Sequence, residues 1–131
     1  MTEESVLELS ELSFDQLEIK ENILRGIYAY GFEKPSLIQH KAIPTLMKGK
    51  DVIAQAQSGT GKTGAFAIGS LCRVDEDLKD TQVIVLSPTR ELADQSFKVI
   101  KELSSYTEIT SCKVIGGTRV YDGIQDLRKN P

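Results

Sequence analysis

The stretch Ala54 to Phe66, AQAQSGTGKTGAF, contains residue types that could bind phosphate. Its core, Ala56-x4-Gly61-Lys62-Thr63, is a relaxed form of the phosphate-binding loop of nucleoside triphosphatases, with alanine at the first position. In such a loop, backbone N–H groups surround the β-phosphate. The Lys62 ammonium would neutralise β- and γ-phosphate oxygens, and the Thr63 hydroxyl would coordinate Mg²⁺. This pattern predicts a nucleotide-binding loop.

The same stretch also contains Gly59-x-Gly61-x-x-Gly64, the glycine pattern of a dinucleotide-binding turn. That turn requires an acidic residue at the end of the next strand, which holds the ribose hydroxyls. The next predicted strand, residues 82–87, runs into Pro88, and the nearby acidic residues precede it. The sequence therefore favours a nucleoside triphosphate over a dinucleotide. The predicted ATP-binding residues of the loop are Ala56, Gln57, Ser58, Gly59, Thr60, Gly61, Lys62 and Thr63.

Composition and charge limit the class of protein. The chain has 131 residues, of which 40% are hydrophobic and 27% charged, an ordinary globular mix for one domain. No apolar run approaches the roughly 20 residues of a membrane span, so we expect no membrane partner. The net charge of -3 argues against a non-specific polycation for nucleic acid. It leaves room for a protein that holds phosphates with backbone amides and a few basic side chains.

The first part of the chain predicts a tail and two helices. Residues 1–13 carry four glutamates and no basic residue, which predicts a flexible acidic tail. Asp15 and Glu18 have the spacing of a capping box, so a first helix is expected behind them and should end at Gly31. A second helix is expected from Ser36 to about Lys48, bent at its internal proline and closed by a glycine.

After residue 50 the pattern changes to short apolar runs that alternate with helical stretches. Residues 51–56, 82–87 and 111–116 are predicted strands. Residues 63–73 and 91–103 are predicted helices that cross between them. This alternation predicts an α/β fold with a parallel sheet flanked by helices. A strand followed by the glycine-rich loop and then a helix is the context that a phosphate loop requires.

Four motifs in order make the sequence similar to the DEAD-box RNA helicases: GFEKPSLIQ (31–39), AQSGTGKT (56–63), PTRELA (88–93) and GG (116–117). The resemblance implies a P-loop NTPase fold, with residues 14–131 forming part of a first RecA-like domain. The family's DEAD, TPGR and SAT segments and its second domain are not in the sequence. We therefore expect the N-terminal portion of an ATP-dependent RNA helicase, an ATP hydrolase as the full-length protein and inactive as this chain alone.

The resemblance makes residues 31–39 an adenine-recognition element. The Gln39 amide matches the N6–H donor and N7 acceptor of adenine, whereas guanine shows acceptors at both places. Phe32 would provide a face on which the base stacks. A structural alternative exists for both residues. Ser36-x-x-Gln39 is itself a capping box, and an isolated phenylalanine is more often part of a core.

The resemblance also implies contacts with the sugar-phosphate backbone of RNA. They are carried over to Pro88, Thr89, Arg90, Gly116 and Gly117. PTR ends a predicted strand and opens a helix, so it would face the carboxyl edge of the sheet, where such folds bind ligands. The plainer interpretation is that Thr89 caps the helix and the glycine pair forms a tight turn.

Within the family, the similarity is greatest to helicases of translation initiation. It implies ATP and Mg²⁺ as cofactors, sequence-independent binding to RNA, and initiation-factor scaffold proteins as partners. A cytoplasmic location is expected, with a nuclear one as the alternative. A non-catalytic ATP-binding module is the alternative function if 131 residues are the natural full length.

Overall fold

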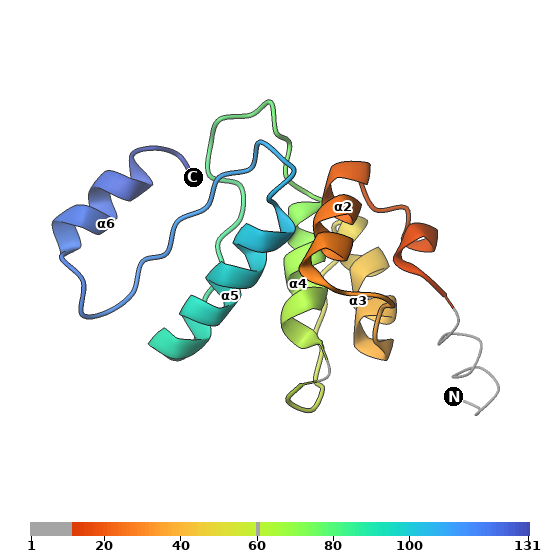
Figure 1. Ribbon diagram of the computed structural model, residues 1–131. Helices are drawn as coiled ribbons and strands as arrows, with labels where there is room; N and C mark the ends of the chain where they lie inside the picture. Colours follow the sequence, from red (N-terminus) through yellow and green to blue (C-terminus); the bar gives the residue numbers. More distant parts are fainter. Residues whose placement is uncertain (1–11, 60) are drawn as a thin grey trace.

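The computed structural model describes residues 12–59 and 61–131, and its regular structure there is helical (Figure 1). Residues 1–11 of the predicted acidic tail lie outside the described residues. The elements, in chain order, are the 3₁₀ turn η1 (Phe14–Leu17) and the helices α2 (Glu21–Tyr30), α3 (Leu37–Met47), α4 (Lys62–Leu71), α5 (Arg90–Leu103) and α6 (Val120–Leu127).

The first predicted helix begins later than its capping signal suggested. The capping box that forms is Ser13 with Gln16, whose Oε1 accepts a hydrogen bond from the Ser13 N–H at 2.8 Å, and it caps η1. Glu18 then takes a left-handed conformation with φ 59°, which ends the turn before α2 starts. Asp15 accepts a hydrogen bond from the Tyr28 hydroxyl instead of capping a helix. The prediction that Asp15 and Glu18 form a capping box was therefore wrong, because Ser13 and Gln16 form the box instead.

Helices α2 to α5 pack into one group around an apolar core (Figure 1). Helix α4 lies against both α3 and α5, and α2 lies against α5. The core is built from aliphatic side chains of α2, α3, α4 and α5, together with the ring of Phe14. Its fully buried members are Phe14, Ile23, Ile27, Ile43, Ile68 and Leu103. Burial of this apolar surface is what holds the helices together.

The three predicted strands do not form among the described residues. Residues 51–56, 82–87 and 111–116 run as non-helical segments, and the side chains of Ile53, Ile84 and Leu86 are largely exposed. Strands of a parallel sheet are stable when their neighbours pair with them and helices cover both faces. Here the main packing is helix on helix. The predicted parallel sheet is consequently not seen in this structure.

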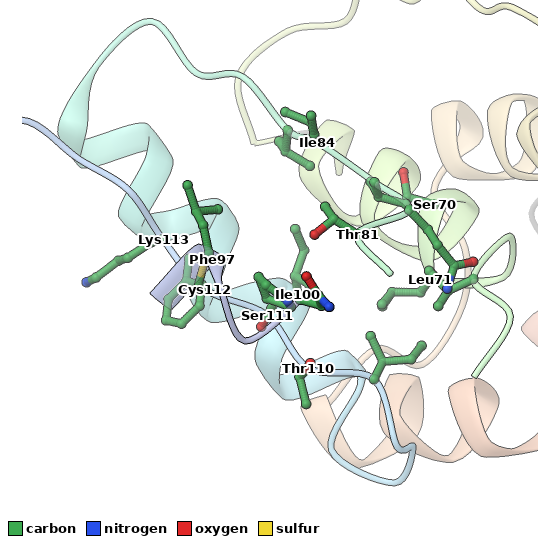
Figure 2. Close-up of a pocket in the computed structure, with 18 of the residues that line it drawn as sticks. Ser70, Leu71, Thr81, Ile84, Phe97, Ile100, Thr110, Ser111, Cys112 and Lys113 are labelled. Atoms are coloured by element: carbon green, nitrogen blue, oxygen red, sulfur yellow. The ribbon is translucent and has the colours of Figure 1, made fainter. Parts of the chain in front are cut away.

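A cavity of about 500 Å³ separates two of these segments from the helices (Figure 2). Leu71 of α4 and Ile100 of α5 line it, and the segments around Ile84 and Thr110 face each other across it. Its lining in the described chain includes none of the predicted ATP or RNA residues. Residues 82–87 and 110–114 both line this cavity, and neither segment is assigned as a strand.

Helix α6 lies apart from the helical group, as Figure 1 shows, and none of its residues is buried. Val120 and Tyr121 at its start are the most exposed of its apolar residues. Cys72 and Cys112 are free, half-buried cysteines. No helix in residues 12–59 and 61–131 is long and apolar enough to cross a membrane.

The contact between α2 and α5 depends on Gly26, which lies against the backbone of Leu103. A Cβ at Gly26 would come within 2.8 Å of the Leu103 carbonyl carbon. We expect Gly26→Ala to lower the free energy of unfolding by about 1–3 kcal/mol, the usual cost of overpacking, as measured by urea unfolding. Gly123→Ala in α6 is the matched control, because its Cβ would meet only Val114 at 3.5 Å. A Gly26→Ala protein as stable as Gly123→Ala would contradict this packing.

Candidate functional site

Two glycines of the glycine-rich loop adopt a left-handed backbone conformation. Gly59 and Gly61 have φ values of 81° and 94°, a left-handed conformation that glycine adopts without strain. Gly61 is the N-cap of α4, and its carbonyl accepts the first bond of that helix from the Ala65 N–H at 3.0 Å. Lys62 and Thr63 form the first turn of α4. Thr60 lies outside the described residues. The loop therefore leads directly into a helix N-terminus, where backbone N–H groups favour anions.

Gln39 connects α3 to this loop. Its side chain is 2% exposed, and its Oε1 accepts a hydrogen bond from the Ser36 N–H at 3.0 Å. Its Nε2 donates to the Gly61 carbonyl at 3.2 Å. Ser36 Oγ accepts from the Gln39 N–H at 3.4 Å, which completes the capping box. The structural role proposed for Gln39 is thus confirmed, and a contact with the phosphate loop is added to it.

The contact between Gln39 and Gly61 was missed by sequence analysis. It joins residues 22 positions apart, and neither motif indicates a partner for the other. The glycines at positions 61 and 64 are the one sequence feature that fits this contact, because a side chain at either position would clash with Gln39. A Cβ at Gly61 or at Gly64 would lie 2.6 Å from Gln39 Nε2. Gly64, the third glycine of the dinucleotide pattern, thus leaves space for this side chain.

Phe32 lies beside Gln39 and against the start of α4. Its ring stacks on Phe14 with centroids 6.2 Å apart and contacts Tyr30 with centroids 4.9 Å apart. A Cβ at Gly64 would lie 3.2 Å from Phe32 Cζ. The ring is half-buried, so it contributes to packing and keeps part of its surface exposed.

These residues line one pocket of about 870 Å³. Five predicted ATP-binding residues border it: Phe32, Gln39, Ala56, Gly59 and Gly61. Ser58, Lys62 and Thr63 are in the adjoining loop and the first turn of α4. Lys34 and Lys41 also line the pocket, and sequence analysis did not select them. A pocket with an aromatic ring, an amide and a glycine-rich loop can hold a base at one end and phosphates at the other.

The predicted RNA-binding residues are exposed and come together through Arg90. Thr89 is the N-cap of α5, and its Oγ1 accepts a hydrogen bond from the Leu92 N–H at 3.2 Å. The plainer interpretation of Thr89 as a cap is therefore confirmed. Arg90 Nη1 donates to the Gly116 carbonyl at 3.3 Å. The structure thus places the PTR and GG motifs next to each other, although 26 positions separate Arg90 from Gly116.

A charged cluster ties α5 to the segment that leads to Gly116. Asp94 accepts a hydrogen bond from Lys113 and forms a salt bridge with Lys98 at 2.8 Å. The Lys113 ammonium also lies 5.5 Å from the centre of the Phe97 ring. The hydrogen bond from Lys113, and after it the one from Lys98, lowers the pKa of Asp94 from 3.8 to about 2.

The chain belongs to the DEAD/DEAH box helicase family, whose model matches residues 36–131. It is 50% identical over 119 residues to the ATP-dependent RNA helicase eIF4A of Aspergillus oryzae, covering 91% of this chain and 28% of that protein. It is 56% identical over 115 residues to the ATP-dependent RNA helicase FAL1 of Coccidioides immitis, covering 88% of this chain and 29% of that protein. The chain spans less than a third of the length of these relatives.

Solved structures of the family resemble the fold. A DEAD box protein from Methanococcus jannaschii matches with a TM-score of 0.82 and 39% identity, over 88% of this chain and 32% of that one. Dbp5 of S. cerevisiae, bound to RNA and ADP BeF3, matches with a TM-score of 0.72 and 47% identity, over 75% of this chain and 26% of the Dbp5 chain. The neighbours are RecA-like DEAD-box helicase domains, in agreement with the RecA-like part of the prediction, whereas the predicted parallel sheet is not seen among the described residues.

The pKa of Asp94 provides a test of the hydrogen bond between Asp94 of α5 and Lys113. An NMR titration of the carboxyl group should give a midpoint near 2. Because this pKa is lowered on folding, its contribution to stability is present above pH 3.8 and is lost as the pH falls toward 2. Lys113→Met should raise the midpoint more than Lys98→Met, the matched control, because Lys113 makes the larger contribution. Equal shifts in the two variants would contradict the described geometry.

Proposed function

We propose that this chain is the ATP-binding portion of an ATP-dependent RNA helicase. The observation that carries the proposal is the buried Gln39 amide, which lies between the cap of α3 and the Gly61 carbonyl of the phosphate loop. This contact puts a group that could recognise a base beside a loop that could bind phosphates. Family membership and the names of the relatives support the same function.

The amide of Gln39 has enough hydrogen-bonding capacity to cap the helix and to bind adenine. A glutamine side chain has two N–H donors and two acceptor lone pairs. One acceptor is used by the Ser36 N–H and one donor by the Gly61 carbonyl. One donor and one acceptor remain, which match N7 and N6–H of adenine. The cap and the base contact are therefore compatible, and Phe32, which lines the same pocket, would stack on the base.

The start of α4 fits the phosphates and their magnesium ion. Lys62 would neutralise β- and γ-phosphate oxygens, and the loop N–H groups would bind the β-phosphate. No cluster of three or more acidic, histidine or cysteine side chains within the described ranges could hold a metal by itself. The Thr63 hydroxyl, together with phosphate oxygens, is the metal-binding group that we propose, since Mg²⁺ commonly takes few protein ligands beside a nucleotide.

The exposed face formed by PTR and GG would contact RNA. Arg90 supplies a guanidinium suited to phosphate, and the glycines allow a backbone to approach closely. Such contacts do not read sequence, and with a net charge of -3 we expect the binding to weaken steeply as salt increases. The structure of Dbp5 with RNA and ADP BeF3 supports RNA and an adenine nucleotide as joint ligands.

In the complete domain, we propose that residues 51–56, 82–87 and 111–116 are strands of the parallel RecA-like sheet. Their apolar side chains, now exposed, would then be covered. The relatives named eIF4A support a role in translation initiation. We propose initiation-factor scaffold proteins as partners and a cytoplasmic location. The structure of Dbp5 with Gle1 supports protein partners for the family in general.

A selective variant tests base recognition. Gln39→Glu keeps an acceptor for the Ser36 N–H but can donate neither to Gly61 nor to adenine N7. We expect it to fold with somewhat lower stability and to lose its preference for ATP over GTP. The loss should be about ten-fold, because each net hydrogen bond contributes roughly 0.5–1.5 kcal/mol. Isothermal titration calorimetry with each nucleotide and Mg²⁺ gives the ratio of affinities.

Two variants serve as controls for this measurement. Gln95→Glu adds the same charge at an exposed position of α5 and should leave both affinities unchanged. Lys62→Ala should weaken ATP and GTP alike, since its ammonium contacts only phosphates. A folded Gln39→Glu protein with the wild-type ratio of affinities would leave Gln39 as a cap alone.

A further inference from the structure

The two glycines of the GG motif differ in what surrounds them. At Gly116, a Cβ would meet only Arg90 Cδ, at 3.6 Å, an ordinary van der Waals distance. At Gly117, a Cβ would lie 2.6 Å from Arg90 Nη1, which is closer than real Cβ contacts allow. Gly117 also has a φ of 83°, in the left-handed region, whereas the φ of Gly116 lies outside it. The Arg90 guanidinium thus occupies the space above Gly117.

A hydrogen bond fixes the guanidinium in this place. Arg90 Nη1 donates to the Gly116 carbonyl at 3.3 Å, and the turn below it is closed by Thr118 Oγ1, which donates to the Ile115 carbonyl at 2.8 Å. The carbonyl of Gly116 therefore binds Arg90, and the missing side chain of Gly117 leaves the volume that the guanidinium fills. The Arg90 side chain is exposed, so these two features set where its charge lies.

We propose that Gly117 is a positioning residue for Arg90, holding its guanidinium ready for the phosphates of RNA. This inference rests on the proposed function, since it concerns the same RNA-binding face. A free arginine side chain loses rotamer freedom when it binds a phosphate. An arginine already fixed by the Gly116 carbonyl has lost part of that freedom before RNA arrives, so more of its interaction appears as affinity. The remaining N–H donors of the Arg90 guanidinium stay available for phosphate oxygens.

The first measurement uses the free chain. The Nη–H signals of arginine in ¹⁵N NMR spectra report whether a guanidinium is held, since a hydrogen bond from Nη1 slows its rotation and exchange, and the Arg90→Lys spectrum assigns the signal of Arg90. We expect a slowly exchanging Arg90 signal in the wild type and in Gly116→Ala, and its loss in Gly117→Ala. Gly117→Asn separates the two constraints, because asparagine tolerates the left-handed conformation but adds a Cβ. The signal should be lost there as well.

The second measurement is RNA affinity, from the fluorescence anisotropy of a short labelled oligouridylate at low salt. Gly117→Ala should weaken binding about two- to ten-fold, which corresponds to ordering one long side chain. Gly116→Ala should have a smaller effect. Gly123→Ala, in α6, should have none. In an Arg90→Ala background, Gly117→Ala should cause little further loss, because the two residues act through one contact.

Three results would overturn the proposal: an Arg90 signal that persists in Gly117→Ala, an equal loss of affinity in Gly116→Ala, or an undiminished loss in the Arg90→Ala background. Thermal unfolding of each variant shows whether a loss of affinity reflects a loss of fold. A wild-type chain that binds no RNA would contradict the proposed RNA contact, while the NMR comparison would still decide whether Gly117 positions Arg90.

Discussion

The arrangement of the proposed nucleotide site depends on the hydrogen bonds of one buried amide. Gln39 is almost completely buried, and a buried amide that lacks hydrogen-bond partners costs about 1–3 kcal/mol for each unpaired group. Its partners come from two places, the backbone of Ser36 and the carbonyl of Gly61. These two hydrogen bonds therefore connect the start of α3 to the start of α4, and the pocket that we propose for the nucleotide is lined by residues of both regions.

Helix packing extends this constraint to the rest of the molecule. Helix α4 lies against α3 on one side and α5 on the other, and α5 begins at Arg90. The glycine-rich loop and the face proposed to contact RNA thus both lie at the first turns of two neighbouring helices. Both begin with groups suited to anions: glycine backbone at α4, and a threonine cap with an arginine at α5. Binding chemistry is placed on rigid elements, while the segments between them have little regular structure.

The features that sequence analysis predicted well have local causes. Helices α3, α4 and α5 were placed correctly to within two residues because Ser36, Gly61 and Thr89 mark their starts. The predicted start of α2 was wrong. The Ser13–Gln16 and Asp15–Glu18 pairs both have capping-box spacing, and the structure shows that the first pair forms the box.

Features that depend on contacts between distant residues could not be predicted in the same way. Apolar runs such as residues 82–87 indicate strands, but pairing requires neighbours that sequence periodicity does not supply. The contacts of Gln39 with Gly61, and of Arg90 with Gly116, cross 22 and 26 positions. The motifs marked the right residues in each case. Their mutual arrangement came only from the fold.

Hydrogen–deuterium exchange tests most directly whether the segments around Gln39 and Gly61 form one nucleotide site. Exchange of backbone amides would be compared in the free chain and with saturating MgATP. We predict that amides of residues 36–40 and of residues 59–64 are protected together on addition of the nucleotide. In Gln39→Ala, protection should remain in the loop and fall at residues 36–40. Protection confined to the loop in the wild-type chain would contradict the account, because the base would then have no contact with the Gln39 segment.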